Sequence, residues 1–127
     1  MMLNKTLPEE LTPLNIKAYF SNTLGACGCS ELDTMIESIL RFLHWCENYP
    51  TNIKAMGYFE LYSEIGVFYI IAGLLDGLCL IQHGTSIRYP FLTEDGKRFL
   101  NALETYSAEE IDNANGEAYD GLYYGDF

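Results

Sequence analysis

Apolar residues recur at spacings of three and four from residue 30 to about residue 48, and this is the clearest pattern in the chain. Such spacing places one stripe of side chains on a single face of a helix. Ser30 and Asp33 have the composition of a capping box, and Pro50 ends the segment because the residue before a proline is displaced from helical geometry. The expected buried stripe consists of Leu32, Met35, Ile36, Ile39, Leu43 and Cys46.

Two further helices are expected on either side of this segment. The first covers Leu7–Leu24, and Thr12 followed by Pro13 supplies a cap and a first helical residue within that range. Thr6–Glu9 offers a competing start for the same helix. The other covers about Thr51–Leu61, with a threonine or asparagine cap at its beginning.

A continuous apolar run, Val67–Ala72, marks a fourth segment. Periodicity alone does not distinguish a buried helix from a buried strand in so short a run. Further leucines extend the run beyond the usual strand length, which favours a helix from Glu64 to about Asp76. Ser63 is expected to cap this helix, and Gly77 to follow its last residue, where a left-handed backbone costs glycine little.

A hairpin and two helices are expected after this run. Leu78–Gln82 and Ile87–Leu92 have the composition of short strands, and His83–Ser86 between them has that of a turn. Thr93, followed by two acids, is expected to cap the next helix. Ser107 caps a final short helix, and the glycine-, tyrosine- and acid-rich residues from 116 onward are expected to be loose.

This order of elements resembles a winged helix-turn-helix domain over about Asn52–Leu103. Leu75–Ile81 is similar to the end of a recognition helix that leads into the first wing strand. Phe91–Leu100 is similar to the second wing strand entering the next helix, with the leucine-threonine-x-x-glycine pattern frequent in MarR-like and PadR-like regulators. The resemblance implies a mainly α fold with a small β-hairpin, a winged-helix-like α+β domain with extra N-terminal helices. The expected organisation is one domain over residues 1–106, with N-terminal helices at 7–48, a winged unit at 52–103 and an acidic, aromatic tail at 107–127.

The resemblance implies DNA binding through polar and basic residues of the recognition helix. This chain departs from that pattern, because no Lys or Arg lies between Lys54 and Arg88. Only Arg88, Lys97 and Arg98 match positions at which winged-helix proteins touch the DNA backbone. Since a helix without cations does not neutralise phosphate, we expect the scaffold to serve protein contact or to be buried in a homodimer.

The charge of the chain supports this expectation. The 127 residues include 18 acidic and 7 basic ones, for a net charge of −11. Residues 104–127 hold seven of the acids and none of the bases, so the tail is more negative than the body. A strongly negative chain repels nucleic acid and favours positive partners.

The candidate chemistry for catalysis or metal binding is sparse. Cys27 and Cys29 are the only candidates for metal ligands, because His44 and Cys46 lie at the far end of the intervening helix. No phosphate loop, paired-histidine motif or nucleophile elbow occurs, so neither an enzyme nor a cofactor is expected. No apolar run is long enough to span a bilayer and no secretory signal is visible, so a cytoplasmic location without membrane contact is expected.

The candidate partner-binding residues are tyrosines and tail acids, since tyrosine contributes contact area and a hydroxyl at little entropic cost. The leading hypothesis is a non-enzymatic protein–protein interaction module, expected as a homodimer. One alternative is an acidic DNA mimic that inhibits a nucleic-acid-handling protein, and another is a DNA-binding regulator that uses its wing cations. The partner-binding set is Tyr58, Tyr62, Tyr69, Glu109, Glu110, Asp112, Tyr119, Asp120, Tyr123 and Tyr124.

Overall fold

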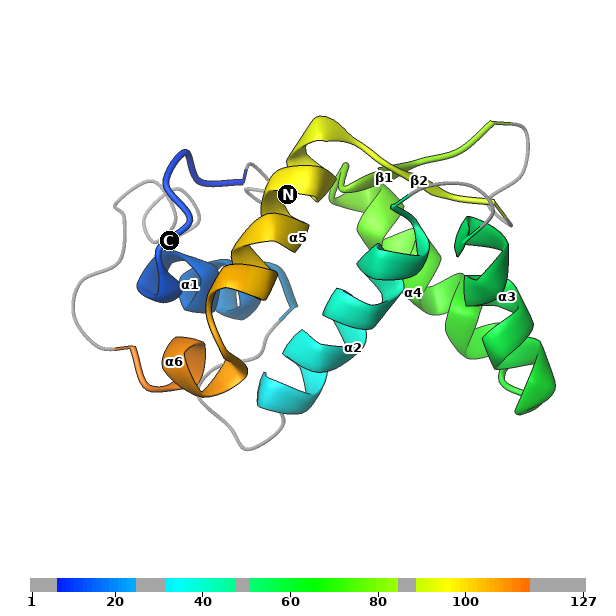
Figure 1. The fold of residues 1–127 in the computed structure, drawn as a ribbon, viewed down its shortest axis with the longest axis horizontal. Helices are drawn as coiled ribbons and strands as arrows, with labels where there is room; N and C mark the ends of the chain where they lie inside the picture. Colours follow the sequence, from blue (N-terminus) through cyan, green and yellow to red (C-terminus); the bar gives the residue numbers. More distant parts are fainter. Residues whose placement is uncertain (1–6, 25–31, 48–50, 85–88, 115–127) are drawn as a thin grey trace. The chain divides into compact units, whose positions relative to one another are not determined.

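The computed structural model describes residues 7–24, 32–47, 51–84 and 89–114 (Figure 1). These residues are mainly helical, with a small two-stranded antiparallel sheet, which confirms the expectation of a mainly α fold with a small β-hairpin. The chain divides into unit 1, residues 1–38 and 101–127, and unit 2, residues 39–100. The elements are α1 (Pro13–Leu24), α2 (Leu32–Trp45), α3 (Thr51–Leu61), α4 (Ile65–Gly77), β1 (Ile81–Gln82), β2 (Phe91–Leu92), α5 (Glu94–Thr105) and α6 (Ala108–Asp112).

The first helix of unit 1 begins at its cap. The Thr12 hydroxyl accepts a hydrogen bond from the amide of Asn15 at 3.2 Å, and α1 starts at Pro13. Proline is suited to this first position because its missing N–H would have no helical partner there. The prediction of a helix from Leu7 is therefore wrong at its start, since Leu7 is buried but lies outside the helix.

The last helix of unit 1 contacts the first. A capping box starts α6, in which the Ser107 hydroxyl accepts from the Glu110 amide and the Glu110 carboxylate accepts from the Ser107 amide. At its other end, the Lys17 ammonium donates to the carbonyl of Asp112 at 2.6 Å and to that of Ala114 at 3.3 Å. A cation from α1 thus satisfies carbonyls that the end of a helix leaves without partners.

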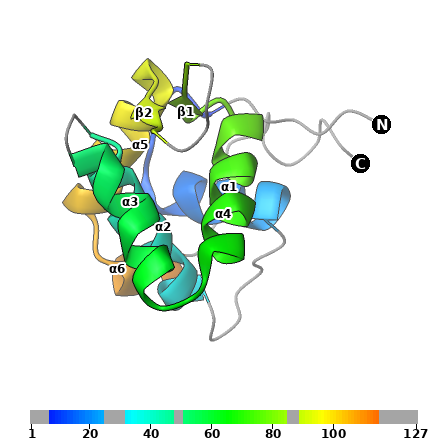
Figure 2. The same cartoon turned by 90° about the vertical axis from the view of Figure 1, so that its right-hand side faces the viewer.

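In unit 2, α3 and α4 lie side by side and are joined by a tight turn (Figure 2). Ser63 has a positive φ of 56°. Its amide donates to the Glu60 carbonyl, and the Glu64 amide donates to the Phe59 carbonyl at 2.7 Å. This is a Schellman motif that ends α3. The prediction of Ser63 as the cap of the next helix is wrong, because Glu64 is the N-cap residue of α4 and makes no side-chain cap bond.

The end of α4 has the same motif two residues later than the sequence predicted. Gly77 is the last helical residue, and the left-handed position is Cys79, with a φ of 62°. The Leu80 amide donates to the Leu75 carbonyl at 2.9 Å, and both of these leucines are buried. Residues 78–80 therefore form a helix C-cap, which is why the first strand is shorter than Leu78–Gln82.

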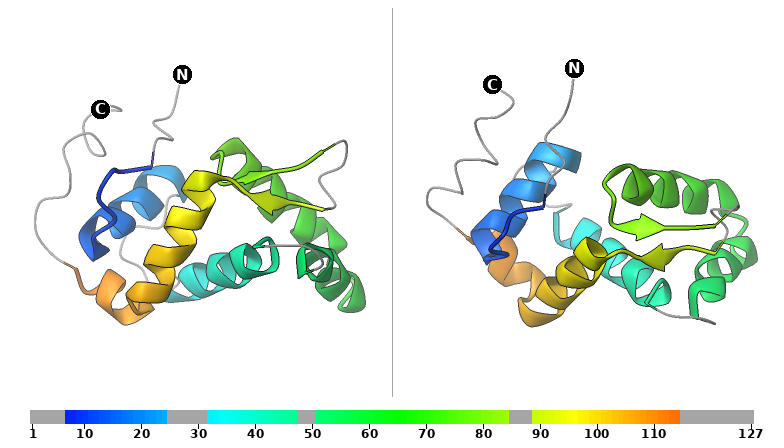
Figure 3. Two further views of the ribbon diagram at one scale, coloured as in Figure 1. Left: turned by 45° about the horizontal axis from the view of Figure 1, so that its top comes forward. Right: turned by 90° about the horizontal axis from the view of Figure 1, so that it is seen from above.

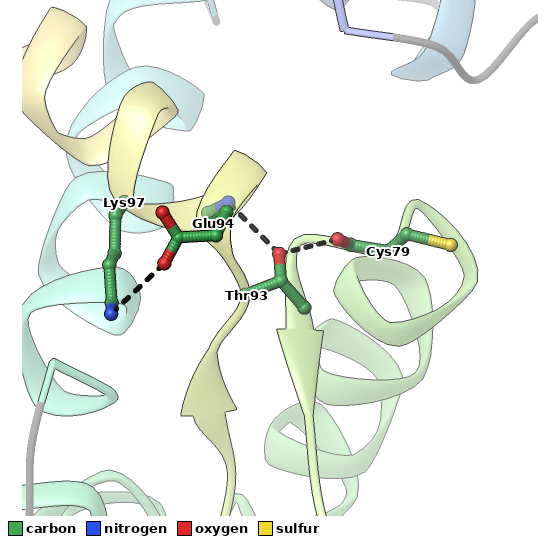
Figure 4. Close-up of polar contacts among 5 residues, drawn as sticks. Cys79, Thr93, Glu94 and Lys97 are labelled. Carbon is green, nitrogen blue, oxygen red and sulfur yellow. Dashed lines mark hydrogen bonds and ion pairs between the residues drawn. The ribbon is translucent and has the colours of Figure 1, made fainter.

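β1 and β2 run antiparallel to each other (Figure 3), and their register pairs Ile81 with Leu92 and Gln82 with Phe91. Thr93 follows β2 directly and caps α5, because its hydroxyl accepts from the Gly96 amide at 3.0 Å. The same hydroxyl donates to the Cys79 carbonyl at 2.6 Å (Figure 4). One side chain thereby connects the end of α4 to the start of α5.

The core of unit 2 is aromatic where α2, α3 and α4 meet. The ring centroid of Phe68 lies 5.6 Å from that of Phe42 and 6.1 Å from that of Phe59. Phe68, Ala72 and Leu75 are the buried residues of α4, at helical spacings of four and three. The fourth helix is thus anchored along one stripe and not enclosed on all sides.

Candidate functional site

The outward side of α4 is apolar and exposed. Ile70 is 72% exposed, and Val67 and Leu74 are also exposed. At 3.6 residues per turn, these side chains project away from the stripe of Phe68, Ala72 and Leu75. No charged residue occurs from Ile65 to Leu75. We call Gly66, Val67, Ile70, Gly73, Leu74 and Gly77 the α4 outer face.

Three of the residues of the α4 outer face are glycines. A Cβ added at Gly66, Gly73 or Gly77 would meet no atom within 4 Å. None of these glycines is therefore required by close packing within the described residues. Gly73 lies inside the helix, where glycine costs about 1 kcal/mol relative to alanine, so the stability of the helix does not explain its presence.

The remaining exposed apolar side chains also belong to unit 2. Ten large hydrophobic side chains are exposed among the described residues, and all of them fall between Ile53 and Phe91. Leu61, at the end of α3, is 76% exposed. Single exposed apolar residues are ordinary, but exposed apolar side chains that share one face, as Val67, Ile70 and Leu74 do on α4, mark a contact surface.

Two of the predicted tyrosines lie together at one end of α3. The ring centroids of Tyr58 and Tyr62 are 5.0 Å apart, and the ring centroid of Trp45 also lies 5.0 Å from that of Tyr58. The Arg41 guanidinium carbon lies 6.0 Å from the centre of the Tyr58 ring, within the range of a cation–π contact. Tyr69, also exposed, lies on α4 with its ring against Phe68.

The predicted tail acids that the structure describes lie on α6, in unit 1. The Glu110 carboxylate already has a hydrogen-bond partner within the chain, because it completes the capping box of α6. The backbone carbonyl of Asp112 accepts from Lys17, and Glu109 is exposed. The acids and the tyrosines thus belong to separate units. Tyr119, Asp120, Tyr123 and Tyr124 lie outside the described residues.

The two described wing cations each have an acidic neighbour one helical turn earlier. The Lys97 ammonium lies 3.4 Å from the Glu94 carboxylate (Figure 4), and the Arg98 guanidinium lies 3.0 Å from the Asp95 carboxylate. Each carboxylate offsets the positive charge that would otherwise neutralise a DNA phosphate. Arg88 lies outside the described residues.

The described cysteines differ in exposure. Cys46 is buried, and burial raises the pKa of its thiol to about 12, whereas Cys79 is exposed. Within the described segments, no group of three or more His, Cys, Asp and Glu side chains is placed to hold a metal ion. Cys27 and Cys29 lie outside those segments.

Sequence reasoning missed the α4 outer face. It expected the scaffold to serve protein contact or to be buried in a homodimer, without separating the two sides of the helix from Glu64 to about Asp76. The glycine spacing of seven and four residues, from Gly66 to Gly73 to Gly77, was the available signal, because it places all three on the stripe of Ile70.

Of the helices in the described residues, none combines the length and the apolar character needed to cross a bilayer.

Comparison with protein-family models, with curated proteins and with solved structures finds no match.

Proposed function

We propose that the chain is a non-enzymatic protein–protein interaction module on a winged-helix-like scaffold. Its contact surface is the α4 outer face, extended by exposed side chains of α3 such as Leu61. The carrying observation is the 72% exposure of Ile70 on a helix whose opposite stripe is fully packed. Transferring an exposed Ile or Leu into a protein contact contributes about 1.5–3 kcal/mol when its burial is complete, which gives this surface a driving force for association.

The charge distribution supports protein over nucleic acid as the partner. A recognition helix contributes cations and hydrogen-bonding side chains to the major groove. The described part of unit 2 instead presents α4 without a basic residue, and Lys97 and Arg98 each have a carboxylate partner. Docking such a helix on a duplex would place apolar area against phosphates and leave them unneutralised.

We also propose a cytoplasmic location for this module. Cys46 and Cys79 are free thiols in the structure. Free thiols are typical of reducing compartments, since secreted domains of this size tend to pair their cysteines.

The test compares Ile70→Glu with Tyr89→Glu, an exposed aromatic position outside α4 that serves as the matched control. The full chain is expressed with two different tags in the cells that naturally make it, and proteins bound to it are quantified after cross-linking. We expect bound protein, a second copy included, to be lost with Ile70→Glu and retained with Tyr89→Glu. Identical bound sets for the wild type and both variants would refute the proposed function.

A further inference from the structure

We infer that the partner of the α4 outer face is a second copy of this chain, bound through an antiparallel crossing of the two α4 helices. This inference rests on the proposed function and names the occupant of the same surface. Three features of the described residues favour a second copy over an unrelated protein: the charge of the face, its shape, and the spacing of its glycines.

The charge of the face allows two copies to meet. Two chains with a net charge of −11 repel each other wherever carboxylates oppose carboxylates. From Ile65 to Leu75, α4 carries no charge, and Asp76, the carboxylate beside Gly77 at the end of the face, lies 3.6 Å from a ring nitrogen of His83. Two copies that meet through this face therefore set no carboxylate opposite another carboxylate along α4. A basic partner attracted to an acidic chain would find no carboxylate on this stretch of helix.

The shape of the face is self-complementary. Ile70 projects from the stripe, while Gly66 and Gly73 leave open space on either side of it. A two-fold interface requires one patch that carries both the projection and the recess that receives it. A surface that binds an unrelated protein would need only a projection or only a recess.

The spacing of the glycines fits one antiparallel register. If Ile70 packs on Gly73 of the second copy, Gly66 lies opposite Gly77 of that copy. This follows because the two residues of each pair are the same number of positions from the two-fold axis. The same register places Tyr69 opposite Leu74. With hydrogen in place of a side chain at three positions on each helix, the two backbones approach closely.

The first experiment is sedimentation equilibrium of the full chain at micromolar concentrations, with Gly73→Leu as the diagnostic variant. In the monomer the added side chain enters open space and replaces a poor helix former, so the midpoint of thermal unfolding of dilute, monomeric protein should rise. In the dimer the same side chain fills the recess for Ile70, so the dimer dissociation constant should increase about tenfold. A destabilised fold cannot produce this opposite pair of effects.

The matched control is Gly57→Leu, on α3, where an added Cβ also meets nothing within 4 Å. We expect it to raise the thermal midpoint without changing the dimer dissociation constant. Ile70→Glu should give a folded monomer, because the substituted position is already exposed. Equal dimerisation of Gly73→Leu and the wild type would overturn the inference.

The second experiment tests the register. With Cys27, Cys29 and Cys79 replaced by serine, copies carrying Gly66→Cys are mixed with copies carrying Gly77→Cys under mild oxidation. We expect the mixed disulfide to predominate over either symmetric one. Symmetric disulfides through position 66 would indicate a parallel arrangement and overturn the inference.

Deletion of residues 115–127 distinguishes another occupant. If the second copy covers the α4 outer face, the deletion leaves the dimer dissociation constant unchanged. A wild type that is monomeric while the deleted form dimerises would show that the tail occupies the face, and would overturn the inference. A monomer that still loses bound protein on Ile70→Glu would overturn it too, but would leave the proposed function standing.

Discussion

The Thr93 hydroxyl donates a 2.6 Å hydrogen bond to the carbonyl of Cys79, a residue held in the left-handed region of backbone space. The same oxygen caps α5 by accepting from the Gly96 amide. Two breaks in regular structure, the exit from α4 and the entry into α5, therefore depend on one side chain.

Replacing Thr93 with valine should lower the free energy of unfolding by about 1–2 kcal/mol, because the cap and the bond to the Cys79 carbonyl are both lost while the shape is kept. Thr93→Ser retains the hydroxyl and should recover most of the loss. Urea denaturation followed by circular dichroism measures both. Equal stabilities for the two variants would show that the hydroxyl contributes nothing.

Gly96→Ala should destabilise unit 2 by about 3 kcal/mol. A Cβ at this position would overlap the carbonyl oxygen of Leu80, a backbone atom that cannot swing aside. The control is Gly57→Ala, where the added methyl meets nothing within 4 Å and should stabilise the fold by about 1 kcal/mol. Thermal unfolding of the two variants should therefore shift in opposite directions, and a neutral Gly96→Ala would contradict this packing.

Lys17→Met should destabilise unit 1 by about 1–2 kcal/mol, because the carbonyls of Asp112 and Ala114 lose a charged donor. Lys54→Met, at an exposed position of α3, removes the same charge as a control. Amide hydrogen exchange in α6 reports the effect locally. Exchange that rises equally in both variants would indicate a general charge effect instead of a lost cap.

The Cys46 thiol makes stability depend on alkaline pH. Its pKa is raised from 9.0 to about 12 by burial, so above pH 9 the unfolded chain ionises this thiol while the folded chain does not. The stability that Cys46 contributes is complete below pH 9 and is lost as the pH rises toward 12. The stability of the wild type relative to Cys46→Ala should fall by about 1.4 kcal/mol between roughly pH 8 and pH 10.

The check is a pair of urea titrations for each protein at the two pH values. Thiol labelling is an independent test, since Cys79 should react in the folded chain and Cys46 only after unfolding. A difference between wild type and Cys46→Ala that does not change with pH would contradict the burial of this thiol.

The sequence predicted those helix ends that depend on local side-chain chemistry. The hydroxyls at Thr12, Thr93 and Ser107 cap the following helices as expected, since such a cap needs only a short polar side chain at the right position. It failed at Ser63 and Cys79, where the left-handed residue is not glycine. Their position is set by the packing of the preceding helix, as with Leu75 and Leu80, which composition does not reveal.

The candidate surface was only half predictable for a related reason. An apolar run such as Val67–Ala72 identifies a helix that avoids water, but burial of Phe68 and exposure of Ile70 follow from where α2 and α3 pack. Tyr58 was expected to contact a partner, and its placement next to Trp45 depends on the same packing.

The Lys17 bonds to the end of α6 have a consequence for the order of events during synthesis. Unit 2 is one continuous stretch, residues 39–100, so all of it is synthesised before α6. The Asp112 carbonyl that accepts from Lys17 of α1 lies 95 residues downstream. α1 therefore emerges well before its partner α6, and the Lys17 bonds form only after unit 2 has been synthesised, so α1 lacks them while nascent-chain chaperones act.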